Sequence, residues 1–204
     1  MAALVGKKIG MTQVFTEDGT RVPVTVIQAG PCPVTAVRDP ERDGYAAIQL
    51  GFEEAPEHKL TQAELGHLKK AGAGSLRTLV EFRDPDAGHQ IGEVLTVEQF
   101  EPGQRVKVSG TSIGKGFQGT VRRHNFARGP VSHGSHNIRA PGAIGASADP
   151  SRVFKGTRMP GRMGGGRVTQ RRLEVVEVDT ERNLLLVKGA VPGPNNGTVE
   201  VRSD

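Results

Sequence analysis

The sequence predicts a mainly β protein, either a barrel or a sandwich, with a long irregular basic segment inserted between its strands. Short runs of β-branched and aromatic residues recur over residues 1–113 and return after residue 172. Many short strands at close spacing are typical of barrels and sandwiches. Between these two parts, residues 114–172 hold twelve glycines and four prolines, which exclude long helices or strands there.

The first part of the chain contains two predicted strand pairs. Val14–Phe15 and Arg21–Ile27 flank Asp18 and Gly19, a dipeptide typical of a hairpin turn. Pro23 indicates that the second of these strands starts late or lies at an edge. The other predicted pair turns around Asp43 and Gly44, and its strands are Val34–Arg38 and Tyr45–Phe52.

One helix is predicted, over Thr61–Ala71. Thr61 can cap its first turn and Glu64 follows three residues later, which is the pattern of a capping box. Lys69 and Lys70 suit the negative end of the helix dipole. Further strands are predicted at Leu76–Phe82 and Arg105–Ser109.

Alternating patterns return after the basic segment. Leu173–Val178 and Leu184–Lys188 flank a loop at Asp179–Asn183, and Gly197–Arg202 is a last strand. Since strands lie on both sides of residues 114–172, we expect a globular β body made of residues 1–113 and 173–204. Residues 114–172 are then an extended arm inserted into that body.

Charge is distributed very unevenly along the chain. The formal net charge is +5 and the pI is near 9.7, which indicates an acidic partner. Residues 114–172 carry twelve basic residues and only one acid, Asp149, whereas the remainder is mildly acidic. Ten of the twelve cations are arginines, whose planar fork grips phosphate. This asymmetry predicts an arm that binds nucleic acid and that a partner must order.

Several enzyme or export signals are weak. Gly114, Gly116 and Gly119 match a dinucleotide-binding pattern. That pattern also requires a helix directly after the glycines and an acidic residue about twenty residues further along the chain, and the sequence shows neither. We interpret these glycines as letting the backbone approach phosphate beside Lys115. Cys32 is interpreted as a small apolar filler, and with no apolar leader or spanning run we expect a cytoplasmic protein.

The histidines of the arm do not form a convincing metal or catalytic site. His124, His133 and His136 have only Asp149 as an acidic neighbour, so neither a zinc site nor a hydrolase triad is predicted. We expect them to stack on bases or to donate to phosphate. The sequence predicts no catalytic residue, no metal and no cofactor.

Five stretches together resemble the bacterial ribosomal protein L-three family over nearly the whole chain. They are Gly6–Thr12, Gly110–Val121, Arg139–Gly145, Val153–Met159 and Arg182–Ala190. The resemblance implies a translation-protein-type β-barrel with a small α/β part and a long irregular extension. It also implies a structural, non-catalytic constituent of the large ribosomal subunit that binds 23S ribosomal RNA early in assembly.

The resemblance carries further expectations about partners. The tip of the arm should approach the peptidyl transferase centre, and the neighbours should include L-fourteen and L-nineteen, with no membrane and no small-molecule substrate. Many bacterial relatives carry a glutamine at the tip, but here Ala146, Ser147 and Ala148 stand at the matching positions. The tip is expected at Gly142, Ala143, Ile144, Gly145, Ala146, Ser147 and Ala148.

The expected RNA contacts are the cations and histidines of the arm and two lysines near the start of the chain. They are Lys7, Lys8, Lys115, Arg122, Arg123, His124, Arg128, His133, His136, Arg139, Arg152, Lys155, Arg158, Arg162, Arg167, Arg171 and Arg172. Two alternatives stay open: a general nucleic-acid chaperone without a fixed site, and a dinucleotide-binding enzyme.

Overall fold

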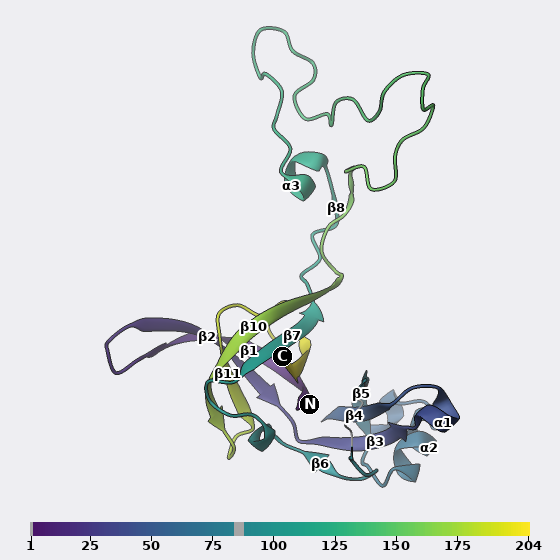
Figure 1. Cartoon of the computed structure of the whole chain (residues 1–204), viewed down its shortest axis with the longest axis vertical. Coiled ribbons are helices and arrows are strands. Elements are labelled where there is room, and N and C mark those ends of the chain that lie inside the picture. The colour runs from purple at the N-terminus through teal and green to yellow at the C-terminus, as the bar shows by residue number, and fades with distance from the viewer. Residues whose placement is uncertain (1, 84–87) are drawn as a thin grey trace. The chain divides into compact units, whose positions relative to one another are not determined.

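The computed structural model describes residues 2–83 and 88–204 of the chain (Figure 1). It consists of two compact units. One unit, here called the body, comprises the chain up to Thr111 together with Arg167–Asp204. The other unit, here called the insert, is Ser112–Gly166.

Six strands of the body form a closed barrel in which every neighbouring pair is antiparallel. Closure leaves no unpaired sheet edge, which confirms the barrel among the two predicted all-β architectures. In their order around the barrel, the strands are β1 (Ala3–Phe15), β12 (Thr198–Ser203), β7 (Arg105–Thr111), β10 (Arg167–Asp179), β11 (Leu184–Lys188) and β2 (Arg21–Ala29).

The barrel interior is filled by alternate residues of these strands. Val106 and Val108 of β7 are fully buried, whereas Lys107 between them is partly exposed on the outer surface. The same alternation buries Leu185 and Val187 on β11. A period of two is what a pleated strand imposes, so the apolar alternation in the sequence fixes which face turns inward.

A second sheet in the body has the order β5-β4-β3-β6. Its strands are β3 (Cys32–Arg38), β4 (Ala47–Glu54), β5 (Leu76–Phe82) and β6 (Val94–Leu95). Most buried apolar residues of its strands, among them Ile48 and Phe82, belong to one hydrophobic cluster with those of the barrel. The two sheets therefore share this part of the core.

Short helices complete the body: α1 (Pro40–Asp43), η1 (Glu57–Lys59), α2 (Gln62–Lys70) and η2 (Val97–Gln99). The predicted helix is confirmed as α2. The Thr61 hydroxyl accepts from the Glu64 amide at 3.3 Å and the Thr61 amide donates to the Glu64 carboxylate at 2.8 Å. This is the capping box that the sequence predicted.

The structure differs from the predicted strands most at β1 and β10. Strand β1 starts at Ala3, eleven residues before the predicted Val14, because its first half buries consecutive small and apolar residues and shows no simple alternation. Strand β10 starts at Arg167, because residues 167–170 pair with 108–111 of β7. The insert therefore ends at Gly166, and residues 167–172 belong to the body, which corrects the expected arm boundary at 172.

A candidate nucleic-acid interface on the insert

The insert leaves and returns through a narrow two-stranded stem. The Ser112 amide donates to the Gly166 carbonyl at 2.9 Å, and Lys115 and Met163 are joined by a second backbone hydrogen bond of 2.9 Å. Strands β8 (Phe117–Gln118) and β9 (Gly161–Arg162) continue this ladder. Gly164 has a φ of +69°, and a Cβ there would collide with the Ile113 carbonyl, so the stem needs glycine at this position.

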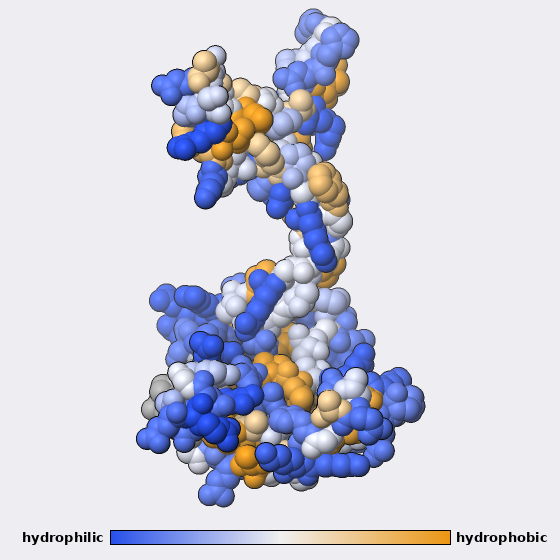
Figure 2. All heavy atoms as spheres, turned by 90° about the vertical axis from the view of Figure 1, so that its right-hand side faces the viewer, coloured by the Kyte–Doolittle hydropathy of each residue, from blue (hydrophilic) through white to orange (hydrophobic). Residues whose placement is uncertain are grey.

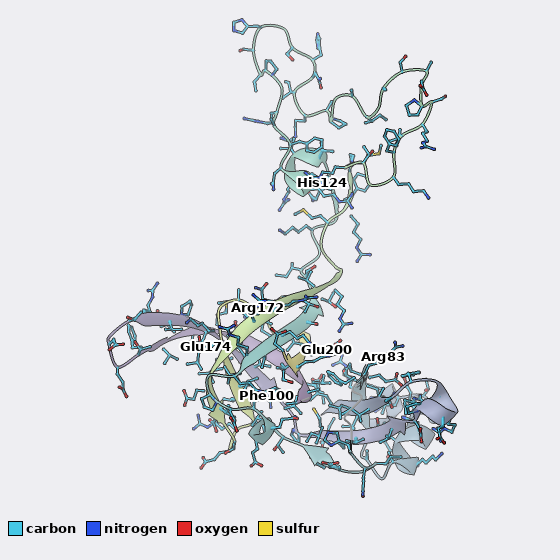
Figure 3. All side chains as sticks on the ribbon, viewed as in Figure 1. Arg83, Phe100, His124, Arg172, Glu174 and Glu200 are labelled. Carbon is cyan, nitrogen blue, oxygen red and sulfur yellow. The ribbon has the colours of Figure 1, made fainter. Side chains whose placement is uncertain are left out.

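A one-turn helix, α3 (Thr120–His124), holds the two sides of the insert together beyond the stem. The Arg123 Nη1 donates to the Met159 carbonyl at 2.8 Å, and the His124 Nε2 lies 3.0 Å from the same oxygen, to which it donates (His124 is labelled in Figure 3). Asn125 ends the helix in the left-handed region. Arg123 and His124 thus fix the chain path beyond β8 and β9.

The insert has almost no interior. Thr120 is its only buried residue, whereas Phe117, Val131 and Phe154 are 77%, 65% and 57% exposed. Figure 2 shows such apolar side chains at its surface, interspersed with hydrophilic ones. Burial of apolar surface therefore contributes little to ordering this unit.

The charges of the insert are unpaired. Its nine cations face a single acid, Asp149, and none of them makes an ion pair with a described residue. The Arg152 guanidinium lies 5.4 Å from the centre of the Phe154 ring. The cations of the insert are Lys115, Arg122, Arg123, Arg128, Arg139, Arg152, Lys155, Arg158 and Arg162.

The predicted tip is an exposed run of small residues. Residues 142–148 are all exposed, Gly142 has a φ of +83°, and Ser147 forms an isolated bridge with Pro150. A Cβ on Gly145 would lie 3.6 Å from the Arg152 carbonyl, which is an ordinary contact. A larger side chain at residue 145 would therefore alter the outer surface of the tip with little internal strain.

The structure separates several of the predicted RNA contacts from the insert. Arg167, Arg171 and Arg172 lie on β10 of the barrel. Lys7 makes a 3.0 Å ion pair with Glu53. Lys8 is only 8% exposed and donates to the carbonyls of Val191 and Gly193 at 3.0 and 3.3 Å, so it holds the loop before β12 in place.

The dinucleotide pattern has a different structural context from the one it requires. The helix that follows Gly119 is only five residues long, and β8 pairs antiparallel with β9. Within residues 2–83 and 88–204, no three His, Cys, Asp or Glu side chains converge on a possible metal position. In the same part of the chain, no helix is long and apolar enough to cross a membrane.

Comparisons with known proteins identify the family. Residues 57–183 match the family described as ribosomal protein L3. This chain belongs to that family. A large ribosomal subunit protein uL3 of Trichlorobacter lovleyi is 56% identical over 200 residues, covering 98% of this chain and 95% of the relative. The uL3 proteins of Synechococcus sp. strain JA-2-3B'a(2-13) and Thermosynechococcus vestitus are 56% and 52% identical, each covering 97% of this chain and 94% of its own length.

Membership of the ribosomal protein L3 family confirms the resemblance found in the five sequence stretches. Proteins of this family are structural constituents of the large ribosomal subunit, and binding of ribosomal RNA is general among them. A ribosomal RNA partner accounts physically for an insert with unpaired cations and no core, because phosphates can balance its charge.

Proposed function

We propose that the insert is the principal RNA-binding element of this ribosomal constituent and that its target is 23S ribosomal RNA. One observation carries the proposal: nine cations, none ion-paired with a described residue, on a unit with one buried side chain. Release of counterions from RNA would supply the free energy that apolar burial does not supply here. Binding early in assembly fits a segment that needs RNA to become ordered.

The role of the protein is structural, and no residue acts as a catalyst. Within the ribosome it acts in the cytoplasm, with L-fourteen and L-nineteen as proposed protein neighbours. The exposed tip, Gly142–Ala148, reaches toward the peptidyl transferase centre, where its small side chains allow close packing between RNA helices.

The test of the RNA-binding role is removal of the insert. A short Gly-Ser linker would join Ser112 to Gly166, whose backbones already share a hydrogen bond of 2.9 Å. We expect a cooperative melt like that of the intact chain, because the linker leaves the body core intact. If about half of the nine cations contact phosphate, the log–log salt slope of 23S RNA binding should become shallower by roughly 3–4.

Equal salt slopes for the intact chain and the linker variant would rule out the insert as the RNA-binding element. Competition with bulk RNA separates a specific constituent from a general chaperone. Bulk RNA should displace 23S RNA poorly if the site is specific, whereas equal competition would favour the chaperone function.

The tip is tested with Gly145→Arg. We expect an unchanged melt of the isolated protein, and in assembled subunits a slower peptidyl transfer or an altered response to drugs that act at that centre. Ala127→Arg, at an exposed position of the insert outside the tip, is the control for adding a cation to the insert. Normally assembled Gly145→Arg subunits with unchanged transfer rates and drug responses would contradict the proposed place of the tip.

A further inference from the structure

The second sheet of the body ends in an open edge at β5. In the described part of the chain, β5 pairs with β4 on one side and with no strand on the other (Figure 1). Within residues 2–83 and 88–204, no backbone group outside this sheet is hydrogen-bonded to the backbone of β5. An edge strand presents a row of unpaired amide and carbonyl groups, to which another strand can bind.

This edge lacks most of the features that protect sheet edges in other proteins. Short strands, prolines and lysines are common protections. At the other end of the same sheet, β6 has two residues and is protected by its shortness. Strand β5 has seven residues, with neither proline nor lysine among them. Thr78, Val80 and Phe82 are types that favour strands, so β5 offers a regular edge along its whole length.

The two faces of β5 have different environments. Phe82 is buried in the hydrophobic cluster of the body, and Val80 packs against that cluster. Side chains alternate between the faces of a strand, so Arg77, Leu79 and Glu81 lie together on the opposite face. None of these three side chains is fully buried. They are therefore available to side chains of a strand added beside β5.

Both charged side chains of this face can bind a further partner. The Arg77 side chain is 69% exposed, and its Nη1 lies 3.8 Å from the Glu53 carboxylate, which is a long ion pair. The Glu81 carboxylate accepts from Arg38 at 3.2 Å on one oxygen and from Tyr45 at 3.1 Å on the other. A carboxylate oxygen accepts two hydrogen bonds, so each oxygen of Glu81 has room for another donor.

The order of the side chains on this face is self-complementary. A cation, an aliphatic residue and an acid follow one another at equal spacing as Arg77, Leu79 and Glu81. When two copies of β5 run antiparallel with Leu79 opposite Leu79, Arg77 of each copy is opposite Glu81 of the other. Opposite charges and apolar pairs directly across two strands both stabilise the pairing. This register also gives every residue of β5 a partner in the second copy.

We propose that the free protein forms a twofold homodimer in which β5 of one copy pairs antiparallel with β5 of a second copy, centred on Leu79. The dimer joins the two sheets into one and covers an edge that is otherwise open to foreign strands. The self-complementary order of Arg77 and Glu81 favours a second copy of this chain over an unrelated strand. One added strand is a small interface, so the Kd is in the micromolar range.

The experiment is sedimentation equilibrium of the full-length, RNA-free protein over a concentration series from micromolar to millimolar. The mass should rise from that of a monomer to that of a dimer. Arg77→Glu places acids opposite each other at both ends of the paired strands and should raise the Kd on the order of tenfold. Arg77→Glu with Glu81→Arg restores opposite charges and should return the Kd to near its original value. Lys59→Glu, an exposed charge reversal outside the sheet, is the matched control and should leave the Kd unchanged.

Cysteine substitutions test the register of the pairing. In the proposed dimer the two Leu79 Cα atoms are roughly 4.5–5.5 Å apart, so Leu79→Cys should form a disulfide-linked dimer under mild oxidation. Arg77→Cys is the control, because its two copies are separated along the strands by the distance from residue 77 to residue 81, about 13 Å. The native Cys32 is fully buried and does not compete. Electrophoresis without reductant measures both variants.

A monomeric mass over the whole series would overturn the dimer and leave the edge of β5 to another occupant, such as a strand of a neighbouring protein. A dimer that Leu79→Cys does not capture, or that Arg77→Glu does not weaken, would equally overturn pairing through β5. The unchanged chain shows by itself whether a dimer forms, so the proposal remains testable if a variant fails to fold. RNA binding by the insert is measured separately and is independent of each of these outcomes.

Discussion

The body and the insert are parts of one chain, yet they owe their structure to different interactions. The body packs both of its sheets on one apolar cluster, in which Phe82, Leu4 and Ile27 are fully buried. The insert buries only Thr120, and the hydroxyl of Thr120 has no hydrogen-bond partner. The order of the insert thus depends on its stem, on the hydrogen bonds of Arg123 and His124 to the Met159 carbonyl, and on an external partner.

The two regions also differ in how their charges are balanced. In the body, acids accompany the cations: Glu53 pairs with Lys7, Glu81 with Arg38 and Glu174 with Lys188. In the insert, Asp149 is the one acid and makes no ion pair with any residue that the structure describes. By formal count the body holds 18 basic and 21 acidic residues, a net charge of −3, whereas the insert carries +8 and requires an anion from outside.

The largest expected difference is in limited proteolysis of the isolated protein. Trypsin should cut at Arg128, Arg139 or Arg152 on the order of a hundredfold faster than at Lys107 or Lys188, which lie in barrel strands. Cleavage products read by mass spectrometry give the order of cuts. Addition of 23S RNA should slow the cuts in the insert selectively. Equal cutting of insert and barrel strands would remove the distinction between the two regions.

The next difference concerns truncation of aromatic side chains. Phe82→Ala should lower the free energy of unfolding by about 3–5 kcal/mol, because it opens a cavity in the core. Phe117→Ala, at a position that is 77% exposed, should change it by less than about 0.5 kcal/mol. Urea unfolding of both variants measures this. A similar cost at Phe117 would show that the insert shares the core's stability.

Lys8 tests whether a cation near the start of the chain serves the fold or the RNA. Lys8→Met leaves the carbonyls of Val191 and Gly193 without their donor and should cost about 1–3 kcal/mol. Lys7→Met, the control, breaks a partly exposed ion pair with Glu53 and should cost about 0–1 kcal/mol. The salt slope of RNA binding should stay unchanged in Lys8→Met. A slope shallower by about one would restore Lys8 as a phosphate contact.

The smallest expected effect is at the cap of α2. Thr61→Ala should cost about 1 kcal/mol, whereas Thr61→Ser should keep most of the stability. Hydrogen bonds from the Thr61 amide and hydroxyl hold the pKa of Glu64 below its usual value of 4.5. A carboxylate with a lowered pKa stabilises the fold above that usual value and loses its contribution as the pH falls through the lowered one. The difference in stability between the unchanged chain and the Thr61→Ala variant should therefore shrink in acid, as melting curves at neutral and low pH would show.

Turns, helix caps and strands could be predicted from the sequence where a single short motif or pattern determines them. The capping box at Thr61 and Glu64 and the hairpin around Gly19, whose φ is +75°, occur as predicted. The strand Val34–Arg38 pairs with the following strand, but α1 replaces a tight turn between them. Apolar alternation around Val106 and Leu185 predicted strands because these strands bury one face only.

Other features could not be predicted from the sequence, because they depend on contacts between residues that lie far apart in it. Charge alone places Arg167–Arg172 in the predicted arm, although β7 pairs with residues 167–170 and the cations of the segment are exposed on the barrel. In the sequence, Lys8 is typical of a surface lysine. In the fold it is buried, because it donates to the carbonyls of Val191 and Gly193, which are far from it in the sequence. Lys107 and Arg202 each follow a buried valine in a strand, and this alternation predicts that both cations point outward. Only the register between β7 and β12 shows that they are directly opposite each other.

The position of β12 in the barrel has a consequence for how the protein is made. This strand lies between β1 and β7, and the order of synthesis adds it after every other strand. Until it emerges, β1 and β7 each present an open edge, and open edges pair readily with foreign strands. The insert is synthesised before β12 and is complete while the ring is still open. A nascent chain therefore exposes its full set of insert cations before its body can close, and the last strand sets the moment of closure.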